Sequence, residues 1–193
     1  KLGPFFQYQN FGERLGSLKG LSYNSLGLTR RFTSQLTRDQ WLQIAREIQT
    51  SLSDEVIDEA VRAYPEEAYT RYGEETARAL KVRRDILVDV TNEYVDLLNK
   101  VVTITASHKR EKFYIHILSK DTLEIRVQKL SGKGKEREEY YHRTFSADET
   151  KEVRLFGFGD DDEFEISGTS KSNIQVRIIG GAGNDILTDL DAG

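Results

Sequence analysis

The residues best suited to chemistry lie in two glycine-rich, acidic segments near the end of the sequence. The first contains Asp160, Asp161 and Asp162, and the second runs from Gly180 to Asp185. Glycine permits the positive φ angles of tight turns. Asp, Asn and exposed main-chain carbonyls supply the oxygen ligands that calcium takes in sets of about six to eight. Both segments are therefore candidate calcium-binding turns.

The two segments belong to a short internal repeat. Residues 153–157, VRLFG, match residues 176–180, VRIIG, at an offset of 23 positions. With one residue of slippage, Gly159-Asp160-Asp161 then matches Gly183-Asn184-Asp185. A repeat of this length is typical of one coil of a β-solenoid, in which neighbouring coils share a core. We expect coils at 153–167 and 176–190; the alternative is two ordinary turns between the strands of a β-sandwich.

The second copy of the repeat resembles a known family. Residues 180–188, GGAGNDILT, fit the RTX nonapeptide GGxGxDxUx at every specified position. The resemblance implies that Asp185 is a side-chain ligand for calcium and that Gly180, Ala182 and Asn184 lend carbonyl oxygens. The first copy departs from the pattern, because Phe156 and Phe158 interrupt its glycines. The candidate metal ligands of the two copies are Asp160, Asp161, Asp162, Gly180, Ala182, Asn184 and Asp185.

Charge is distributed unevenly along the 193 residues. The formal net charge is −4, but residues 148–193 contain eleven acidic and four basic residues. This acidic tail suits a cation and disfavours nucleic acid. We therefore expect no nucleic-acid partner. No apolar run approaches the ~20 residues of a membrane-spanning helix, so we expect no membrane insertion by this segment.

The first half of the chain predicts a helical unit. Residues 1–36 are rich in Gly, Ser, Asn and aromatic side chains without clear periodicity, which predicts an irregular lead-in. Thr37 and Ser53 are each followed by acidic residues and a helical apolar pattern, which indicates two capped helices. Tyr64-Pro65 ends the second, because the residue before a proline disfavours the α region. A third helix is predicted over 74–100, which completes a helical unit at 37–100.

The second half predicts β-structure. From Val101 onward apolar residues alternate with polar ones in short runs separated by polar turns, a pattern typical of strands. The expected fold class is α+β, with a helical unit followed by an all-β unit at 101–193 of solenoid, β-roll or sandwich type.

The wider layout also resembles a segment of large bacterial outer-membrane proteins. The resemblance covers residues 30–190 and rests on the motifs LKVRRD at 80–85, RTF at 143–145 and TKEVRL at 150–155. In those proteins a calcineurin-like phosphoesterase domain precedes the segment and a surface-antigen type β-barrel follows. The resemblance implies that this chain is part of a larger exported bacterial protein, is located outside the cytoplasm, and has the other domains of that protein as partners.

Other chemistry has little support in the sequence. There is no cysteine, and the three histidines, His108, His116 and His142, are not at metal-ligand spacing. Arg84 could bind a phosphate or carboxylate, but an arginine in this position more often pairs with a structural acid. The acidic run at 160–163 could hold paired catalytic carboxylates, although a cation site or a solvated loop explains it better.

The functional prediction is a non-catalytic structural or interaction module of an exported bacterial protein, stabilised by calcium at the Gly-Asp turns. The alternative is an accessory part of a phosphoesterase or another surface hydrolase, whose parent protein would be the enzyme. A cleft that gathers Arg84, the histidines and the acidic loop would favour this alternative.

Overall fold

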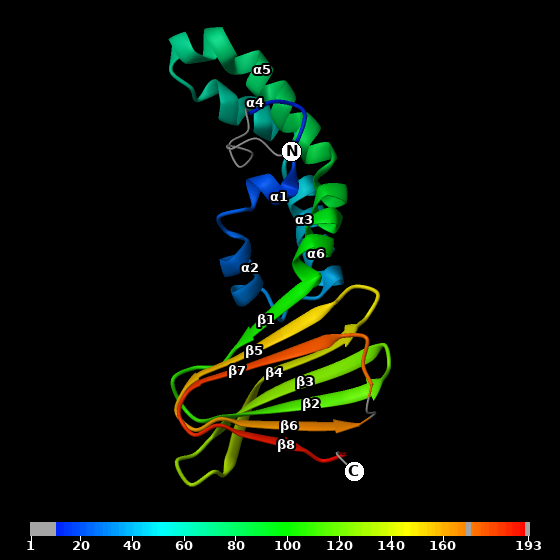
Figure 1. The fold of residues 1–193 in the computed structure, drawn as a ribbon. Coiled ribbons are helices and arrows are strands. Elements are labelled where there is room, and N and C mark those ends of the chain that lie inside the picture. Colours follow the sequence, from blue (N-terminus) through cyan, green and yellow to red (C-terminus); the bar gives the residue numbers. More distant parts are fainter. Residues whose placement is uncertain (1–10, 169–170, 192–193) are drawn as a thin grey trace. The chain divides into compact units, whose positions relative to one another are not determined.

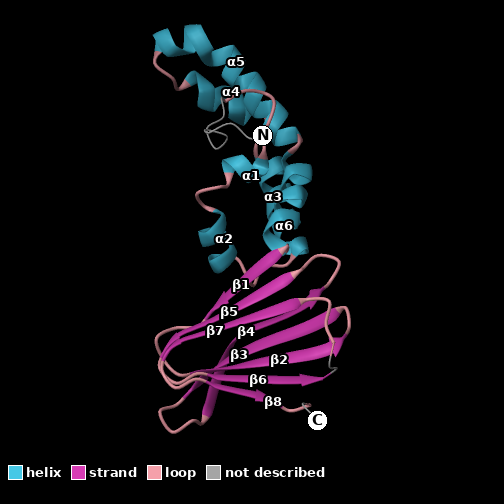
Figure 2. Cartoon of the chain, viewed as in Figure 1, coloured by secondary structure: helices cyan, strands magenta, loops and turns pink. Residues whose placement is uncertain are grey.

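The computed structural model describes residues 11–168 and 171–191, so the first ten residues of the expected lead-in lie outside the description. Within these residues the chain forms six helices and eight strands in two sheets (Figures 1 and 2). The expected α+β class is confirmed. The chain divides into two compact units, one of residues 1–26 and 36–97 and the other of residues 27–35 and 98–193.

Helices make up the first unit and begin earlier than expected. The prediction of an irregular stretch before residue 37 is wrong for the described part, because it contains two helices. The bounds are α1 Leu18–Leu21, α2 Leu26–Phe32, α3 Arg38–Ser51, α4 Asp54–Arg62, α5 Glu66–Asp85 and α6 Leu87–Asn99. Most of α2 belongs to the second unit. None of the helices in the described ranges is long and apolar enough to cross a membrane.

The starts of α3 and α4 follow from their capping residues. Thr37 accepts a hydrogen bond from the Gln40 N–H, and the Gln40 side chain accepts one from the Thr37 N–H, which makes a capping box. Ser53 accepts a hydrogen bond from the Val56 N–H at the start of α4. Both caps satisfy main-chain donors that a helix start leaves free, so both sequence-based helix starts are confirmed.

The single helix predicted over 74–100 is two helices, which is a correction. The Gln49 side chain donates hydrogen bonds of 2.9 Å to the carbonyls of Arg84 and Asp85. The Ile86 N–H bonds to carbonyls within the last turn of α5. A contact from α3 thus occupies carbonyls at the junction, and α5 ends there before α6 begins.

The second unit contains the strands. Their bounds are β1 Val101–Thr105, β2 Glu111–Ser119, β3 Thr122–Leu130, β4 Glu136–Ser146, β5 Glu152–Gly159, β6 Glu163–Gly168, β7 Gln175–Ala182 and β8 Ile186–Asp189. One sheet has the order β1-β5-β7 and the other has the order β4-β3-β2-β6-β8. The pairs β1–β5, β5–β7, β2–β6 and β6–β8 are parallel, whereas β2–β3 and β3–β4 are antiparallel.

The same offset governs both sheets. Gln175 pairs with Glu152 in one sheet and Ile186 pairs with Glu163 in the other, each 23 positions apart. We call β1–β2, β5–β6 and β7–β8, each of which is two consecutive strands joined by a turn, the strand pairs. The three strand pairs therefore lie side by side in register. The first pair precedes the second by 51 positions, as Val101 and Glu152 show. The extra residues contain the β3–β4 hairpin, which interrupts the repeat.

The apolar core of this unit collects side chains from both sheets. It includes Val153 and Leu155 from one sheet and Phe113 and Phe164 from the other, whose rings stack at 4.7 Å. Residues of the same position in successive strand pairs are neighbours in this core. The 23-residue match between the two copies therefore reflects shared packing positions.

We predict a contrast between two leucines of the β unit. Leu155→Ala should lower the free energy of unfolding by about 2–4 kcal/mol, because Leu155 is fully buried and its truncation leaves a cavity. Leu187→Ala should cost less than ~0.5 kcal/mol, because Leu187 is exposed. Urea unfolding measures both values, and equal losses would contradict the assigned core.

Candidate functional site

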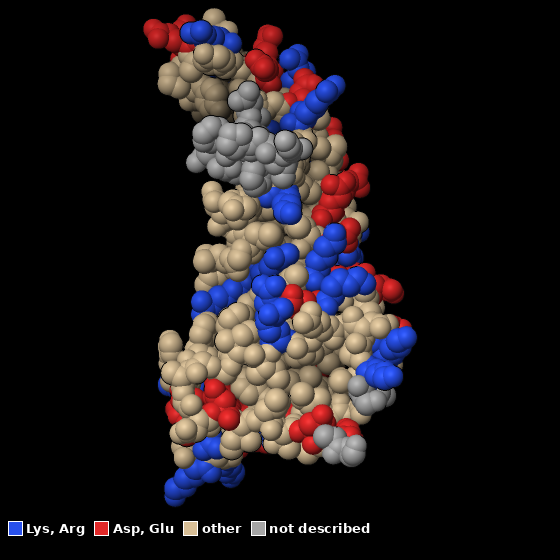
Figure 3. Space-filling view, viewed as in Figure 1, with Lys and Arg blue, Asp and Glu red and all other residues tan. Residues whose placement is uncertain are grey.

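The candidate site is the turn that joins the two strands of each strand pair. These turns lie at 106–110, 160–162 and 183–185. The register places Glu111, Asp162 and Asp185 at the same position of the three pairs. Figure 3 shows acidic side chains on the β unit at the side where these turns lie and also at the opposite side. The fold therefore stacks one acidic residue upon another.

Correspondence of the turns differs from the sequence alignment. Gly159 pairs with Ala182 without slippage, so Asp162, and not Asp161, is the counterpart of Asp185. The one-residue slippage was wrong because three consecutive aspartates allow alternative alignments.

Hydrogen bonds connect the stacked acids into a ladder. Asp185 Oδ1 accepts from the Asp162 N–H at 3.1 Å, and Asp162 Oδ1 accepts from the Glu111 N–H at 2.8 Å. Glu111 in turn accepts from the hydroxyl and the N–H of Ser107. Beside the ladder, Asp161 Oδ1 accepts from the Asn184 N–H at 2.8 Å. In the Asp185–Asp162 and Asp162–Glu111 hydrogen bonds, a carboxylate of one strand pair accepts from a main-chain N–H of the preceding pair.

Asp162 is the electrostatically unusual member of the ladder. Its side chain is 0% exposed and its Oδ2 atom has no hydrogen-bond partner among the described residues. Burial raises the pKa of Asp162 to about 7, against the Glu111 N–H, which lowers it. The negative charges of Glu111, Asp185 and Asp160 raise this pKa further. At neutral pH the Asp162 carboxyl is therefore protonated in a large share of the molecules, and a nearby cation would favour its ionised form.

Glycines make room for the ladder carboxylates. A Cβ atom added to Gly180 would overlap the Asp185 carboxylate, and one added to Gly157 would overlap both Asp162 Oδ2 and the carbonyl oxygen of Gly180. The spacing is the same in both turns, with the aspartate five residues after the glycine. Asp162 Oδ2 and the Gly180 oxygen thus both lie closer than van der Waals contact to the position that a Cβ atom on Gly157 would take, a place that only glycine leaves open.

Two positions in each copy, one near the end of the strand and one in the turn, have positive φ angles. Gly181 and Gly183 have φ values of 110° and 146°, and their counterparts Phe158 and Asp160 have values of 75° and 71°. Non-glycine residues at positive φ cost roughly 1–2 kcal/mol each. Phe158 and Asp160 therefore adopt the same backbone conformation as the glycines of the second copy, but at an energetic cost.

Tyr140 on β4 adds a polar group near the ladder. Its hydroxyl is buried and has no hydrogen-bond partner in the described part of the chain. Burial raises the pKa of Tyr140 well above its usual range, and the charges of Glu111 and Asp162 raise it further. The interior near the turns therefore contains two buried carboxylates and one neutral hydroxyl.

The predicted ligands are brought to neighbouring turns but do not form a side-chain cage. Within the described ranges, no three His, Cys, Asp or Glu side chains gather as a metal-binding group. Asp160 accepts a hydrogen bond from the adjacent Asp161 N–H, Asp161 accepts one from the Asn184 N–H of the next turn, and Asp185 is exposed. The unpartnered Asp162 Oδ2 next to the Gly180 carbonyl fits a cation better than any other predicted ligand. A bound ion would need further main-chain oxygens or water.

Sequence reasoning missed Glu111 and Tyr140. Glu111 is 1% exposed and occupies the Asp162 position of the first strand pair. The signal for Glu111 was its distance of 51 residues from Asp162, which the β3–β4 hairpin disguises. Nothing in the local sequence marks Tyr140.

The other singled-out residues have separate partners. Arg84 donates to Asp54 Oδ1 at 2.6 Å and to Asp85 Oδ1 at 2.8 Å, which supports the structural role weighed for it. Of the described histidines, His116 bonds Ser167 at 2.8 Å, His142 bonds Glu124 at 2.9 Å, and His108 lies against Phe158. These contacts do not supply the shared cleft that the hydrolase alternative requires.

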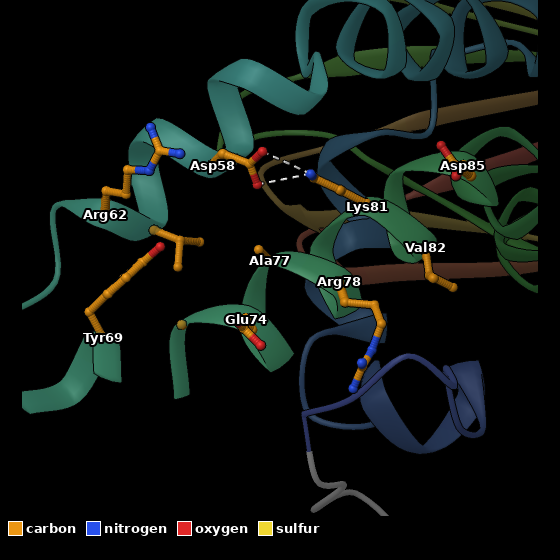
Figure 4. A pocket seen from close by; sticks show the side chains of 11 residues that line it. Asp58, Arg62, Tyr69, Glu74, Ala77, Arg78, Lys81, Val82 and Asp85 are labelled. Atoms are coloured by element: carbon orange, nitrogen blue, oxygen red, sulfur yellow. Dashed lines mark hydrogen bonds and ion pairs between the residues drawn. The ribbon is translucent and has the colours of Figure 1, made fainter. Parts of the chain in front are cut away.

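A hollow of about 460 Å³ lies between α4 and α5 (Figure 4). Asp58 and Lys81 form an ion pair of 2.8 Å at its edge. The Tyr69 ring covers the place where Gly73 would carry a Cβ atom. The lining mixes both charges and holds no unpartnered buried polar atom in the described chain, so the hollow shows no built binding site.

Comparison of the chain with protein-family models, with curated proteins and with solved structures found no match.

We predict that the Gly180–Asp185 pair is energetically coupled. Gly180→Ala should destabilise the protein by roughly 1–3 kcal/mol, because the three atoms nearest to the new methyl group all belong to the Asp185 side chain. Asp185→Ala should relieve much of this loss in the double variant. Gly157→Ala should not be relieved by Asp162→Ala, because its methyl group also meets the Gly180 carbonyl.

Thermal melts of the four variants and the two doubles measure this coupling. Gly27→Ala is the control, because nothing lies within 4 Å of the added methyl group. Equal rescue of both glycine variants would contradict the assigned geometry.

Proposed function

We propose that the chain is a non-catalytic structural or interaction module whose β part is a short β-solenoid of three coils. The observation that supports this proposal best is the common 23-residue offset of β5–β7 and β6–β8, which extends through both sheets. A sandwich does not require its two sheets to advance by the same number of residues. A coil that passes through both sheets does.

Calcium is the proposed stabilising ion of this module. Asp162 Oδ2 is buried without a partner beside the Gly180 carbonyl, and Glu111, Asp160 and Asp185 add negative charge around it. A hard cation would neutralise this charge and take oxygen ligands. Asp162 and the Gly180 carbonyl would form the centre of the site, with Ala182, Asn184, Asp185 and the neighbouring aspartates as further donors.

The proposed setting is outside the cytoplasm, within a larger bacterial protein. Low calcium inside the cell would leave the turns destabilised by the ladder charges, and high calcium outside would stabilise them. The partners in this proposal are other domains of the same protein. The acidic turns support an interaction with cations rather than with nucleic acid.

Calcium should raise the melting temperature at pH 8, where the Asp162 carboxyl is mostly ionised. We expect saturable binding in calorimetry and a shift of several degrees at calcium concentrations far above the Kd. Asp162→Asn should abolish most of this shift, because it removes the carboxylate at the centre of the proposed site. The fold should be retained, because the amide keeps the acceptor for the Glu111 N–H and offers a donor to the Gly180 carbonyl. Asp148→Asn, which removes an exposed acid away from the turns, should respond like the wild type. A calcium shift that persists in Asp162→Asn would rule out this site.

Without calcium, stability should fall as the pH rises from about 4 to about 7 through Asp162. In this window the unfolded chain has already released the Asp162 proton, whereas the folded chain, with the raised pKa of about 7, retains it. The loss should amount to a few kcal/mol at most. Asp162→Asn should remove this pH dependence and be more stable than the wild type at pH 8. Urea unfolding in a chelating buffer at pH 5 and pH 8 measures the effect, and a wild type that gains stability across this window through Asp162 would contradict it.

A further inference from the structure

At one end of the β unit, none of the described residues covers the outer side of the β7–β8 strand pair as a further strand. Phe113 and Phe164 are 0% and 2% exposed, whereas Leu187, at the same position of the last pair, is 60% exposed. Ile186, which is 52% exposed, stands instead at the position of Glu163 and so outside the core positions. The exposed apolar side chain of Leu187 in a core position indicates a surface that another element covers.

The main chain of this end is open as well. β7 is the last strand of one sheet and β8 is the last strand of the other, so both outer edges lack a neighbouring strand within the described ranges. The ladder also ends there. Asp162 accepts from Glu111 and Asp185 accepts from Asp162, so the Asp185 N–H is the next donor in the series. A similar bond occurs at the other end of β6 and β8, where the Asp191 carboxylate accepts from the Gly168 N–H at 2.6 Å.

A second copy of this chain fits the open end poorly. Head-to-tail stacking would require β2 to pair with β8 of another copy, but β2 already lies between β3 and β6. Tail-to-tail pairing would bring two sets of Asp185, Asp189 and Asp191 together, and like charges across a strand pair are destabilising. The open end therefore suits a different polypeptide segment.

The chemistry of that segment follows from the positions it would occupy. Asp189 stands at the position of Ile115 and Ile166, so the last pair presents a carboxylate where the earlier pairs have core residues. An acid in a core position at a sheet edge opposes pairing with segments that lack a matching charge. A basic residue opposite Asp189 would provide this charge, and a carboxylate opposite Asp185 would bind its N–H.

We propose that the β7–β8 end binds one further strand–turn–strand segment in parallel, with an aspartate at the turn and a basic residue opposite Asp189. The segment would add a strand to each sheet and cover Leu187. This inference rests on the stacked-coil arrangement of the proposed function, but it does not depend on calcium. Main-chain hydrogen bonds would provide affinity and the two charged positions would provide selectivity.

The test uses a labelled synthetic peptide of residues 171–191 that carries Asp189→Lys, added to the intact protein. Fluorescence anisotropy should detect saturable binding. The same peptide with Asp185→Ala should bind about tenfold more weakly, because it lacks the carboxylate for the Asp185 N–H of the protein. The unsubstituted peptide should also bind at least tenfold more weakly, because it places Asp189 opposite Asp189.

Protein variants locate the binding surface. Leu187→Ser should weaken binding about tenfold, whereas Leu118→Ser should leave it unchanged, because Leu118 is 47% exposed on β2, away from the open end. No binding to the folded wild type, or equal binding by both variants, would overturn the proposal. A dimer in light scattering that Leu187→Ser abolishes would show that a second copy covers this end, and would also overturn it. If the peptide fails to bind but calcium still stabilises the protein, the proposal for the open end is wrong and the proposed function stands.

Discussion

In-register parallel pairing is the constraint on which the β unit depends. It brings residues 23 positions apart, or 51 across the hairpin, to neighbouring places in both sheets. Apolar positions then meet apolar positions and make a continuous core. The same rule also stacks Glu111, Asp162 and Asp185, whose mutual repulsion must be compensated. The N–H donors of the preceding strand pair and the room left by Gly157 and Gly180 provide part of this compensation.

Much of the fold could be predicted from local patterns. Thr37 and Ser53 mark helix starts because capping depends on residues only three positions apart. The change from α5 to α6 could not be predicted in the same way, because it depends on Gln49, which is distant in sequence. The 23-residue offset was visible because the VRLFG and VRIIG segments are similar. The first strand pair could be suspected as a further coil only from the strand–loop–strand pattern of residues 102–107 and 112–115, because the hairpin separates it from the second.

The turns of the candidate site could be located from the sequence, and Asp162 was among the candidate ligands, but its burial could not be predicted. Glycines and aspartates identified the turns, yet the nonapeptide pattern directed attention to Asp185, which is exposed. Asp162 differs because a following strand pair covers it, and burial is a property of position within the stack. Glu111 has no glycine pattern around it, and Tyr140 comes from the inserted hairpin. Their proximity follows from tertiary structure alone.

The inserted hairpin also affects the order in which the chain can fold. Closing a loop costs more entropy as it lengthens, by about 0.6 kcal/mol for each doubling, and β1 must find β5 across 51 residues rather than 23. β2, β3 and β4 pair with their sequence neighbours, so this antiparallel part can form from local contacts. Once it has formed, the ends of the long loop are already near each other. The hairpin that interrupts the repeat thus shortens the effective search by which the first strand pair joins the other two.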